Sequence, residues 1–276
     1  MPILHAIVLG LVQGLTEFLP ISSSGHLILV PWLFGWHDFG DAAVEKAFDV
    51  ALHIGTLVAM VAYFRRDLSV YVRAGVETAL HRDRPATRDG KLAWLLLLSS
   101  IPAAIAGALF SDAITDHLGK PVIIAVSLIV GGLLLGWADR AAGRRKLDDY
   151  GLRDSLTIGA AQVLALNPGT SRSGITITAG RFVGLDRDAA ARASFLMAVP
   201  VTLGAIVFEM AKLVKDGIPS GLGWPMTVGI VTSGVSGLLA VWGLMRFVRT
   251  HSFRPFVVYR VIAGMAVLIV AATSFR

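Results

Sequence analysis

The chain has 276 residues, of which 55% are hydrophobic and only 16% charged, with a net charge of +6 and no cysteine. Soluble domains carry about 25% charged residues, so this composition indicates a polytopic membrane protein rather than a soluble enzyme. The lack of cysteine excludes disulfides, thiolate catalysis and cysteine-bound zinc. The sequence contains no basic run interleaved with aromatic residues, so we do not expect a nucleic-acid partner.

The chain begins with an apolar region, about 3–35, that is broken in its middle by the motif Pro20-Ile-Ser-Ser-Ser-Gly-His26. Gln13 and Glu17 precede the break and are four residues apart, so they share one face of a helix. A carboxylate at membrane depth must be protonated, paired or bound to a metal. Its oxygens and an amide oxygen suit a hard divalent cation, so Glu17 and Gln13 are candidate ligands of Mg²⁺ or Ca²⁺. A protonated Glu17 bonded to a neighbouring helix is the structural alternative.

The serines of this motif precede a second predicted helix, about 23–34. Serine caps helices well, and a helix N-terminus presents unpaired amides to anions. We therefore expect the small residues of the break to contact phosphate, namely Ser22, Ser24 and Gly25. Ser23 and His26 are three residues apart and could face one another, with His26 acting as a base on Ser23 or attacking phosphorus itself. A helix-to-helix hydrogen bond explains His26 as well.

Six further segments are apolar over roughly 20 residues, which is what a bilayer core requires. They span about 45–64, 92–110, 121–138, 193–214, 226–246 and 255–274. If the basic loop 65–91 is cytoplasmic, so is the basic loop 139–153, and 18 of the 25 Lys and Arg residues fall on that side. The positive-inside rule then places both termini outside. Asp49 and His53, four residues apart in the first of these spans, are weaker candidates for a supporting role.

A second broken region, about 155–183, contains Pro168-Gly-Thr-Ser-Arg-Ser-Gly174. Arg172 has no acidic residue within ten positions on either side, so a local ion pair does not explain it. A guanidinium stays charged and binds phosphate through two parallel hydrogen bonds. We expect Arg172 to hold a phosphate, with further contacts from its neighbours Gly169, Thr170, Ser171, Ser173, Gly174 and Thr176.

An internal repeat relates the two broken regions. A shift of 149 residues aligns Gln13 with Gln162 and Ser22 with Ser171. Three full spans separate the copies, so the second copy must be inverted in the membrane. Ordinary turns would leave the two motifs at opposite faces, whereas re-entrant hairpins entering from opposite sides bring both tips to the midplane.

The predicted fold is therefore an all-α polytopic membrane protein with an inverted-topology repeat. It has about six full transmembrane helices and two re-entrant helical hairpins that meet near the midplane. The chain forms a single membrane domain, 1–276, with a first repeat at about 1–120 and a second at about 150–276.

The two motifs resemble the signatures of the undecaprenyl pyrophosphate phosphatase family, the bacitracin-resistance family. The first signature has Glu or Gln four residues before a Glu, as Gln13 and Glu17 do. The second reads Pro-Gly-X-Ser-Arg-Ser-X-X-Thr, and Pro168 to Thr176 match it at every fixed position. In length and span layout the resemblance covers essentially the whole chain.

The resemblance implies hydrolysis of the terminal phosphate of undecaprenyl pyrophosphate, which recycles the lipid carrier for peptidoglycan synthesis and confers bacitracin resistance. It also implies a divalent metal and a site in the bacterial inner membrane that opens to the outer, periplasmic side. Its important residues fall on Glu17, Ser23, His26 and Arg172, with Gln13, Ser171, Ser173 and Thr176 supporting. It carries no role onto Asp49 or His53.

Several alternatives stay open at this point. The nucleophile is Ser23, His26 or a metal-activated water. A transporter or flippase of a phosphorylated lipid or anion would also use inverted repeats with broken helices. A lipid kinase is weakened by the missing ATP-phosphate loop. Besides the lipid substrate and membrane lipids, the sequence leaves a homodimer open as a partner.

Overall fold

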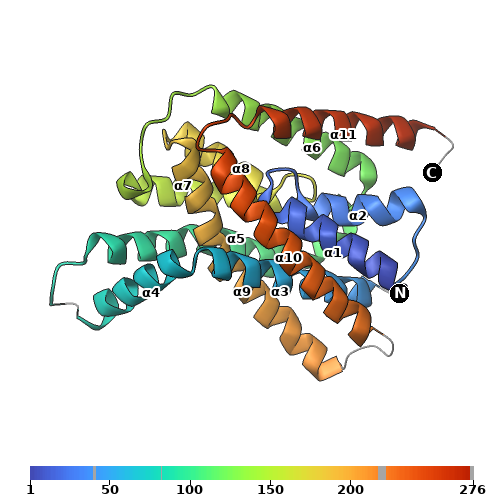
Figure 1. Ribbon diagram of the computed structural model, residues 1–276, viewed down its shortest axis with the longest axis horizontal. Coiled ribbons are helices and arrows are strands. Elements are labelled where there is room, and N and C mark those ends of the chain that lie inside the picture. The colour runs from blue at the N-terminus through green and yellow to red at the C-terminus, as the bar shows by residue number, and fades with distance from the viewer. Residues whose placement is uncertain (40–41, 82, 217–221, 274–276) are drawn as a thin grey trace.

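Apolar runs of this chain fold as helices, because in lipid every backbone amide must find its partner within its own segment. The computed structural model describes residues 1–39, 42–81, 83–216 and 222–273, which contain helices and no strand. All six predicted spans are confirmed as long helices: α3 (Ala42–Tyr63), α5 (Arg88–Leu118), α6 (Pro121–Asp139), α9 (Arg187–Asp216), α10 (Gly223–Phe247) and α11 (Arg254–Ala272). Figure 1 shows them gathered around the shorter helices that carry the two motifs.

The segment 65–91, predicted as a polar loop, contains a further helix, α4 (Arg65–Leu80). It bends from α3 by 82° and packs on α5, where Trp94 Nε1 donates a 3.1 Å hydrogen bond to the Gly75 carbonyl. By length and composition five helices could cross a membrane alone, and α3 joins them only together with α4. The polar residues of α4 concealed its helical period from the hydropathy pattern.

Each broken region forms two short helices around a tight turn. The first gives α1 (Ile3–Phe18) and α2 (Ser23–Phe34). The second gives α7 (Leu152–Val163), a 3₁₀ turn η2 (Leu164–Leu166) and α8 (Arg172–Phe182). The helix ends and starts agree with the breaks predicted at the Ser/Gly motifs.

The turns share one unusual conformation. Among the described residues other than glycine, only Ser22 and Ser171 have positive φ angles, of 79° and 72°. Each of these serines caps the helix that follows it, accepting a hydrogen bond from the amide of Gly25 at 3.3 Å or Gly174 at 3.0 Å. Such backbone conformations are costly for residues with a Cβ and are retained where the surroundings require them. The two positions are those that the 149-residue shift aligns.

The two turns are in direct contact, as predicted. The Gly169 amide donates to Ser22 Oγ at 3.0 Å, and Ser173 Oγ donates to the Leu19 carbonyl at 3.2 Å. A Cβ at Gly25 would lie 3.2 Å from the Gly169 backbone, a tight contact that would require the two turns to move apart by a few tenths of an ångström. The inversion of the repeat and its depth in a membrane stay predictions.

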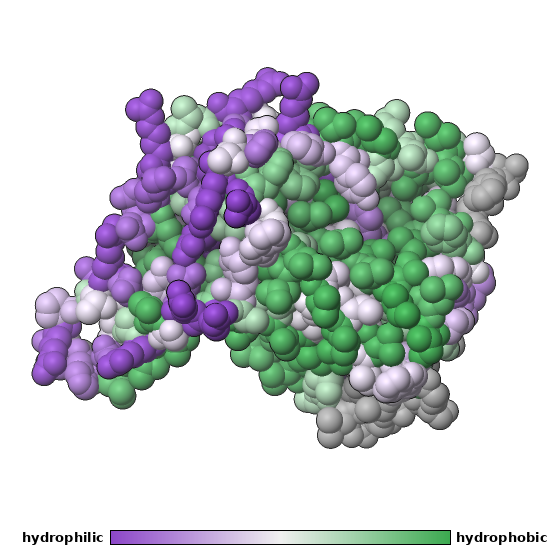
Figure 2. Space-filling model, in the orientation of Figure 1, coloured by the Kyte–Doolittle hydropathy of each residue, from purple (hydrophilic) through white to green (hydrophobic). Residues whose placement is uncertain are grey.

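The surface separates into polar and apolar regions. Figure 2 shows hydrophilic residues gathered over the end that holds α4 and the connection between α6 and α7, with apolar residues over most of the remaining face. Large apolar side chains such as Leu133, Ile262 and Trp242 are more than half exposed. An apolar surface of this extent suits a lipid environment. Together with the long apolar helices it confirms the predicted all-helical, multi-pass membrane protein.

Candidate active site

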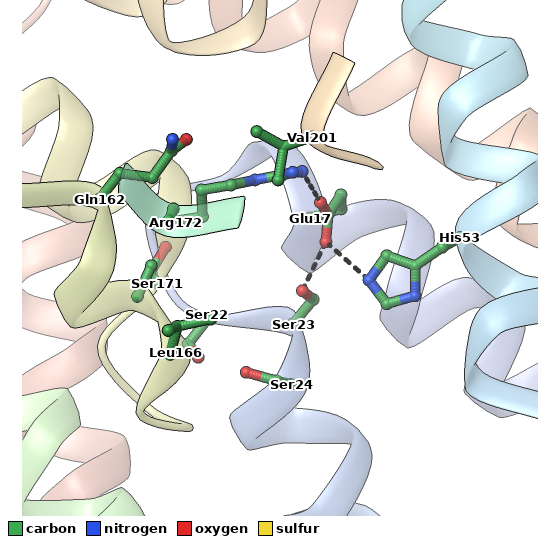
Figure 3. Close-up of a pocket in the computed structure, with 12 residues that line it drawn as sticks. Glu17, Ser22, Ser23, Ser24, His53, Gln162, Leu166, Ser171, Arg172 and Val201 are labelled. Atoms are coloured by element: carbon green, nitrogen blue, oxygen red, sulfur yellow. Dashed lines mark hydrogen bonds and ion pairs between the residues drawn. The ribbon is translucent and has the colours of Figure 1, made fainter. Parts of the chain in front are cut away.

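Glu17, in the last turn of α1, is the centre of a polar cluster (Figure 3). Its side chain is only 5% exposed, and Oε1 forms an ion pair with the Arg172 guanidinium. Oε2 accepts hydrogen bonds from Ser23 Oγ at 2.5 Å and Gln13 Nε2 at 3.2 Å. His53 Nε2 lies 3.7 Å from the same oxygen. The fold therefore joins Glu17, Gln13, Ser23 and Arg172 as the sequence predicted.

The cluster forms one wall of a cavity of about 210 Å³. Ser23 and Arg172, the first residues of α2 and α8, both line it, so both helix N-termini point toward the cavity. Ala103, Leu166 and Val201 form an apolar part of the lining. The positive ends of two helix dipoles and a guanidinium favour an anion, and the apolar side favours a hydrocarbon chain attached to it.

Arg172 is held at both ends of its guanidinium. One nitrogen pairs with Glu17, while Nη1 donates to Thr202 Oγ1 on α9 at 2.6 Å. The side chain keeps 20% of its surface exposed, toward the cavity. Sequence reasoning missed Thr202, whose only signal was a hydroxyl two residues after Pro200 within an apolar run.

His26 does not face Ser23, and that expectation is wrong. Its Nδ1 lies 2.7 Å from the Ser22 carbonyl, its Nε2 lies 2.7 Å from the Tyr259 hydroxyl, and it does not line the cavity. The reason is that Ser23, in the first turn of α2, leans back toward α1, whereas His26 leans toward α11.

The histidine that lies beside the Glu17 carboxylate is His53 on α3. Its Nδ1 lies 2.8 Å from the Asp49 carbonyl, which leaves Nε2 to face Glu17 and the cavity. The four-residue spacing of Asp49 and His53 pointed to this side chain, although the family signatures do not include it.

Some of the remaining motif residues line the cavity, and the others lie in or next to the two turns. Ser22, Ser24 and Ser171 line the cavity together with Glu17, Ser23 and Arg172. The others lie outside the lining and shape the two turns, and these are Gly25, Gly169, Thr170, Ser173, Gly174 and Thr176. Thr176, expected to donate to phosphate, is buried and instead bonds Arg172 O and Ser194 Oγ, each at 2.7 Å.

The donors present fit a divalent cation only in part. Among the residues that the structure describes, no three His, Asp or Glu side chains form a metal-binding group. Glu17 offers a carboxylate, already paired with Arg172, and Gln13 Oε1 is buried without a hydrogen-bond partner. Mg²⁺ is commonly held by one or two carboxylates together with substrate phosphates. The site therefore suits a cation bound jointly with a phosphorylated substrate, and not a preformed protein cage.

This fold and this site together define a class: a helical membrane protein whose paired broken helices surround an anion pocket with a serine, a carboxylate and an arginine. Comparison with known proteins agrees with that class. The sequence profile described as Bacitracin resistance protein BacA matches residues 6–266.

The chain belongs to this BacA family. Relatives named undecaprenyl-diphosphatase match it over nearly their full lengths. The protein from Pelobacter propionicus is 48% identical over 99% of both chains. That from Geobacter sulfurreducens is 48% identical over 97% of this chain and 98% of its own. The Moorella thermoacetica protein is 46% identical over the whole of both.

Proposed function

We propose that this protein is an undecaprenyl-diphosphatase, which hydrolyses undecaprenyl diphosphate to undecaprenyl phosphate and inorganic phosphate and thereby recycles the lipid carrier for peptidoglycan synthesis. The observation that carries the proposal is the 2.5 Å hydrogen bond from the Ser23 hydroxyl to Glu17, beside the Arg172 guanidinium. An alcohol bonded to a carboxylate at an anion site is the arrangement for nucleophilic attack on phosphorus. Bacitracin resistance follows from the same activity.

The reaction begins with the diphosphate in the cavity. Arg172 and the N-termini of α2 and α8 bind its oxygens and stabilise the charge that develops in the transition state. Ser23 Oγ then forms a bond to the terminal phosphorus as the bond to the bridging oxygen breaks. The hydroxyl proton passes to Glu17, and undecaprenyl phosphate leaves.

A second step regenerates the enzyme. Glu17 first gives its proton to the departing undecaprenyl phosphate and becomes a carboxylate again. Water then attacks the phosphorus of the phosphoserine at residue 23 and gives a proton to Glu17. Glu17 passes that proton to the Ser23 oxygen as the phosphorus–oxygen bond breaks, which releases inorganic phosphate and the free serine. The geometry favours Glu17 over His26 as the base, because both ring nitrogens of His26 already have partners. Water directed by Glu17 at the diphosphate in a single step is the alternative to Ser23.

A divalent cation, Mg²⁺ or Ca²⁺, belongs to this proposal. Glu17 and the unpartnered Gln13 oxygen would hold it, and its chemistry is to neutralise the negative charge of the diphosphate. We place the protein in the bacterial inner membrane, with the site open to the periplasmic side. The distribution of charge supports the orientation of the termini in this proposal. The basic segments lie at the polar end, whereas the start of α1 and the end of α11 lie at the other (Figures 1 and 2).

The test is phosphate release from undecaprenyl diphosphate by detergent-purified protein with Mg²⁺, without nucleotide, and with EDTA added in parallel. We expect release that EDTA abolishes and that Ser23→Ala lowers by at least about 10²-fold. Full activity in a Ser23→Ala protein would assign the attack to water. Lack of release from folded wild-type protein would overturn the proposal and favour transport of a phosphorylated lipid or anion.

A further inference from the structure

Arg260, in the middle of α11, is a fully buried cation that the proposed reaction does not use. Its side chain is 0% exposed, so it does not snorkel to a membrane surface. The guanidinium donates to five backbone carbonyls, at 2.9 to 3.1 Å: Pro20, Ser127, Leu128, Gly169 and Thr170.

These five acceptors replace a counter-ion. Among the described residues, no carboxylate lies within ion-pair distance of Arg260. A buried charge is tolerated only when its hydrogen-bonding groups are satisfied, so the carbonyls and the guanidinium hold one another in place. Nε donates to Leu128 and Nη1 to Pro20, while the two hydrogens of Nη2 are shared among the Ser127, Gly169 and Thr170 carbonyls. The planar guanidinium thereby sets the relative directions of the three donor nitrogens.

Three of the carbonyls belong to the two motif turns. Pro20 lies three residues before Ser23, and Gly169 and Thr170 lie just before Arg172. The other two, Ser127 and Leu128, lie on α6, which packs along α11. One side chain therefore connects the turn that starts α2, the turn that starts α8 and a full-length helix.

The space for this side chain is made by glycines. A Cβ at Gly131 of α6 would overlap Nη2 of Arg260 and lie 3.0 Å from its Cζ. A Cβ at Gly174 of α8 would lie 2.8 Å from Nη1. Any larger residue at these positions would displace the guanidinium from its carbonyls.

We propose that Arg260 is a positioning residue that sets the spacing between the Ser23 hydroxyl and the Arg172 guanidinium. It acts through the backbone of both turns and touches no reacting group. The expected effect on kcat rests on the proposed hydrolysis. The spacing between the two turns can be measured without any substrate.

The kinetic test uses two variants. Arg260→Lys keeps the positive charge but removes the planar guanidinium, and Gly131→Ala displaces the guanidinium without altering its chemistry. The matched control is Gly243→Ala in α10, where a Cβ would meet nothing within 4 Å. Misplacement by about 1 Å costs up to about 10²-fold in rate, so we expect kcat to fall 10- to 100-fold in both variants. We expect KM to change by less than about 3-fold, because every group that binds the diphosphate is retained.

The structural test uses the absence of native cysteine. Phe34 and Phe182, at the exposed ends of α2 and α8, are replaced by cysteine and spin-labelled. Double electron–electron resonance then measures the distance between the two labels. We expect a shifted or broadened distance distribution with Arg260→Lys and Gly131→Ala, and none with Gly243→Ala.

Each outcome decides one question. Unchanged label distances and unchanged kcat in folded Arg260→Lys protein would overturn the proposal. Reduced kcat with unchanged distances and an unfolding midpoint lowered in proportion would assign Arg260 a purely stabilising role, which also contradicts it. Failure of the wild-type protein to hydrolyse the diphosphate would refute the function instead, and the label distances would still decide the role of Arg260.

Discussion

The Ser23 hydroxyl donates its hydrogen bond to Glu17 across the break between α1 and α2, although the two residues are only six positions apart. The turn at Ser22 reverses the chain so that the first residue of α2 meets the last turn of α1. The same carboxylate also pairs with Arg172, 155 residues away. The proposed nucleophile, base and phosphate-binding cation are thereby joined through a single side chain.

Glu17→Gln should lower kcat by about 10²- to 10⁴-fold, because the amide cannot accept the proton of Ser23. Initial rates of phosphate release from undecaprenyl diphosphate measure this. Glu45→Gln, at an exposed carboxylate on α3, is the matched control and should retain the wild-type rate. A Glu17→Gln rate within threefold of wild type would remove Glu17 from the proposed mechanism.

His26→Gln should lower kcat without changing the shape of its pH dependence, because His26 holds the Ser22 carbonyl rather than accepting the proton of Ser23. Tyr259→Phe should reproduce part of this loss, since it removes the hydroxyl that bonds the other ring nitrogen. Profiles of kcat against pH for both variants make the comparison. Loss of one limb of the profile in His26→Gln alone would restore the histidine as a catalytic base.

Gln13→Glu should lower the Mg²⁺ concentration needed for half-maximal rate, because a second carboxylate beside Glu17 binds a hard cation more tightly than an amide does. Gln13→Leu should raise that concentration. Phosphate release measured over a series of free Mg²⁺ concentrations gives both values. Identical Mg²⁺ dependence in the three proteins would place the cation elsewhere.

Asp154→Ala should destabilise the protein by about 2 kcal/mol. The Asp154 side chain is only 2% exposed, and it accepts hydrogen bonds from Arg145 at 2.8 and 2.6 Å and from the Gly151 amide at 2.8 Å. Arg145 in turn donates to the Val183 carbonyl just after α8, so the loss loosens the second broken region.

Thermal unfolding in detergent measures this change. Asp148→Ala is its control, because Asp148 pairs with Arg88 at 3.3 Å with both side chains more than 60% exposed. Exposed ion pairs of this kind contribute little. An equal fall in unfolding temperature for both variants would contradict the role given to Asp154.

Sequence alone determined the elements that depend on local composition. Six apolar runs became six long helices, because a bilayer requires an apolar stretch of about that length. Four of them keep close to their predicted ends, whereas α5 runs on to Leu118 and α9 already begins at Arg187. Serines followed by glycine located both helix starts, since capping is a local interaction. The isolated Arg172 and Glu17 marked the site, because charge at membrane depth requires a partner.

Only the tertiary structure decided which side chains meet. Spacing along one helix predicted that Ser23 and His26 face one another. In the structure Ser23 instead donates a hydrogen bond to Glu17, and His26 is hydrogen-bonded to Tyr259, 233 residues away. It also placed Thr202 on the guanidinium and brought Arg260 between both turns. Contacts between distant segments follow from how whole helices pack, and no local pattern of residues records that packing.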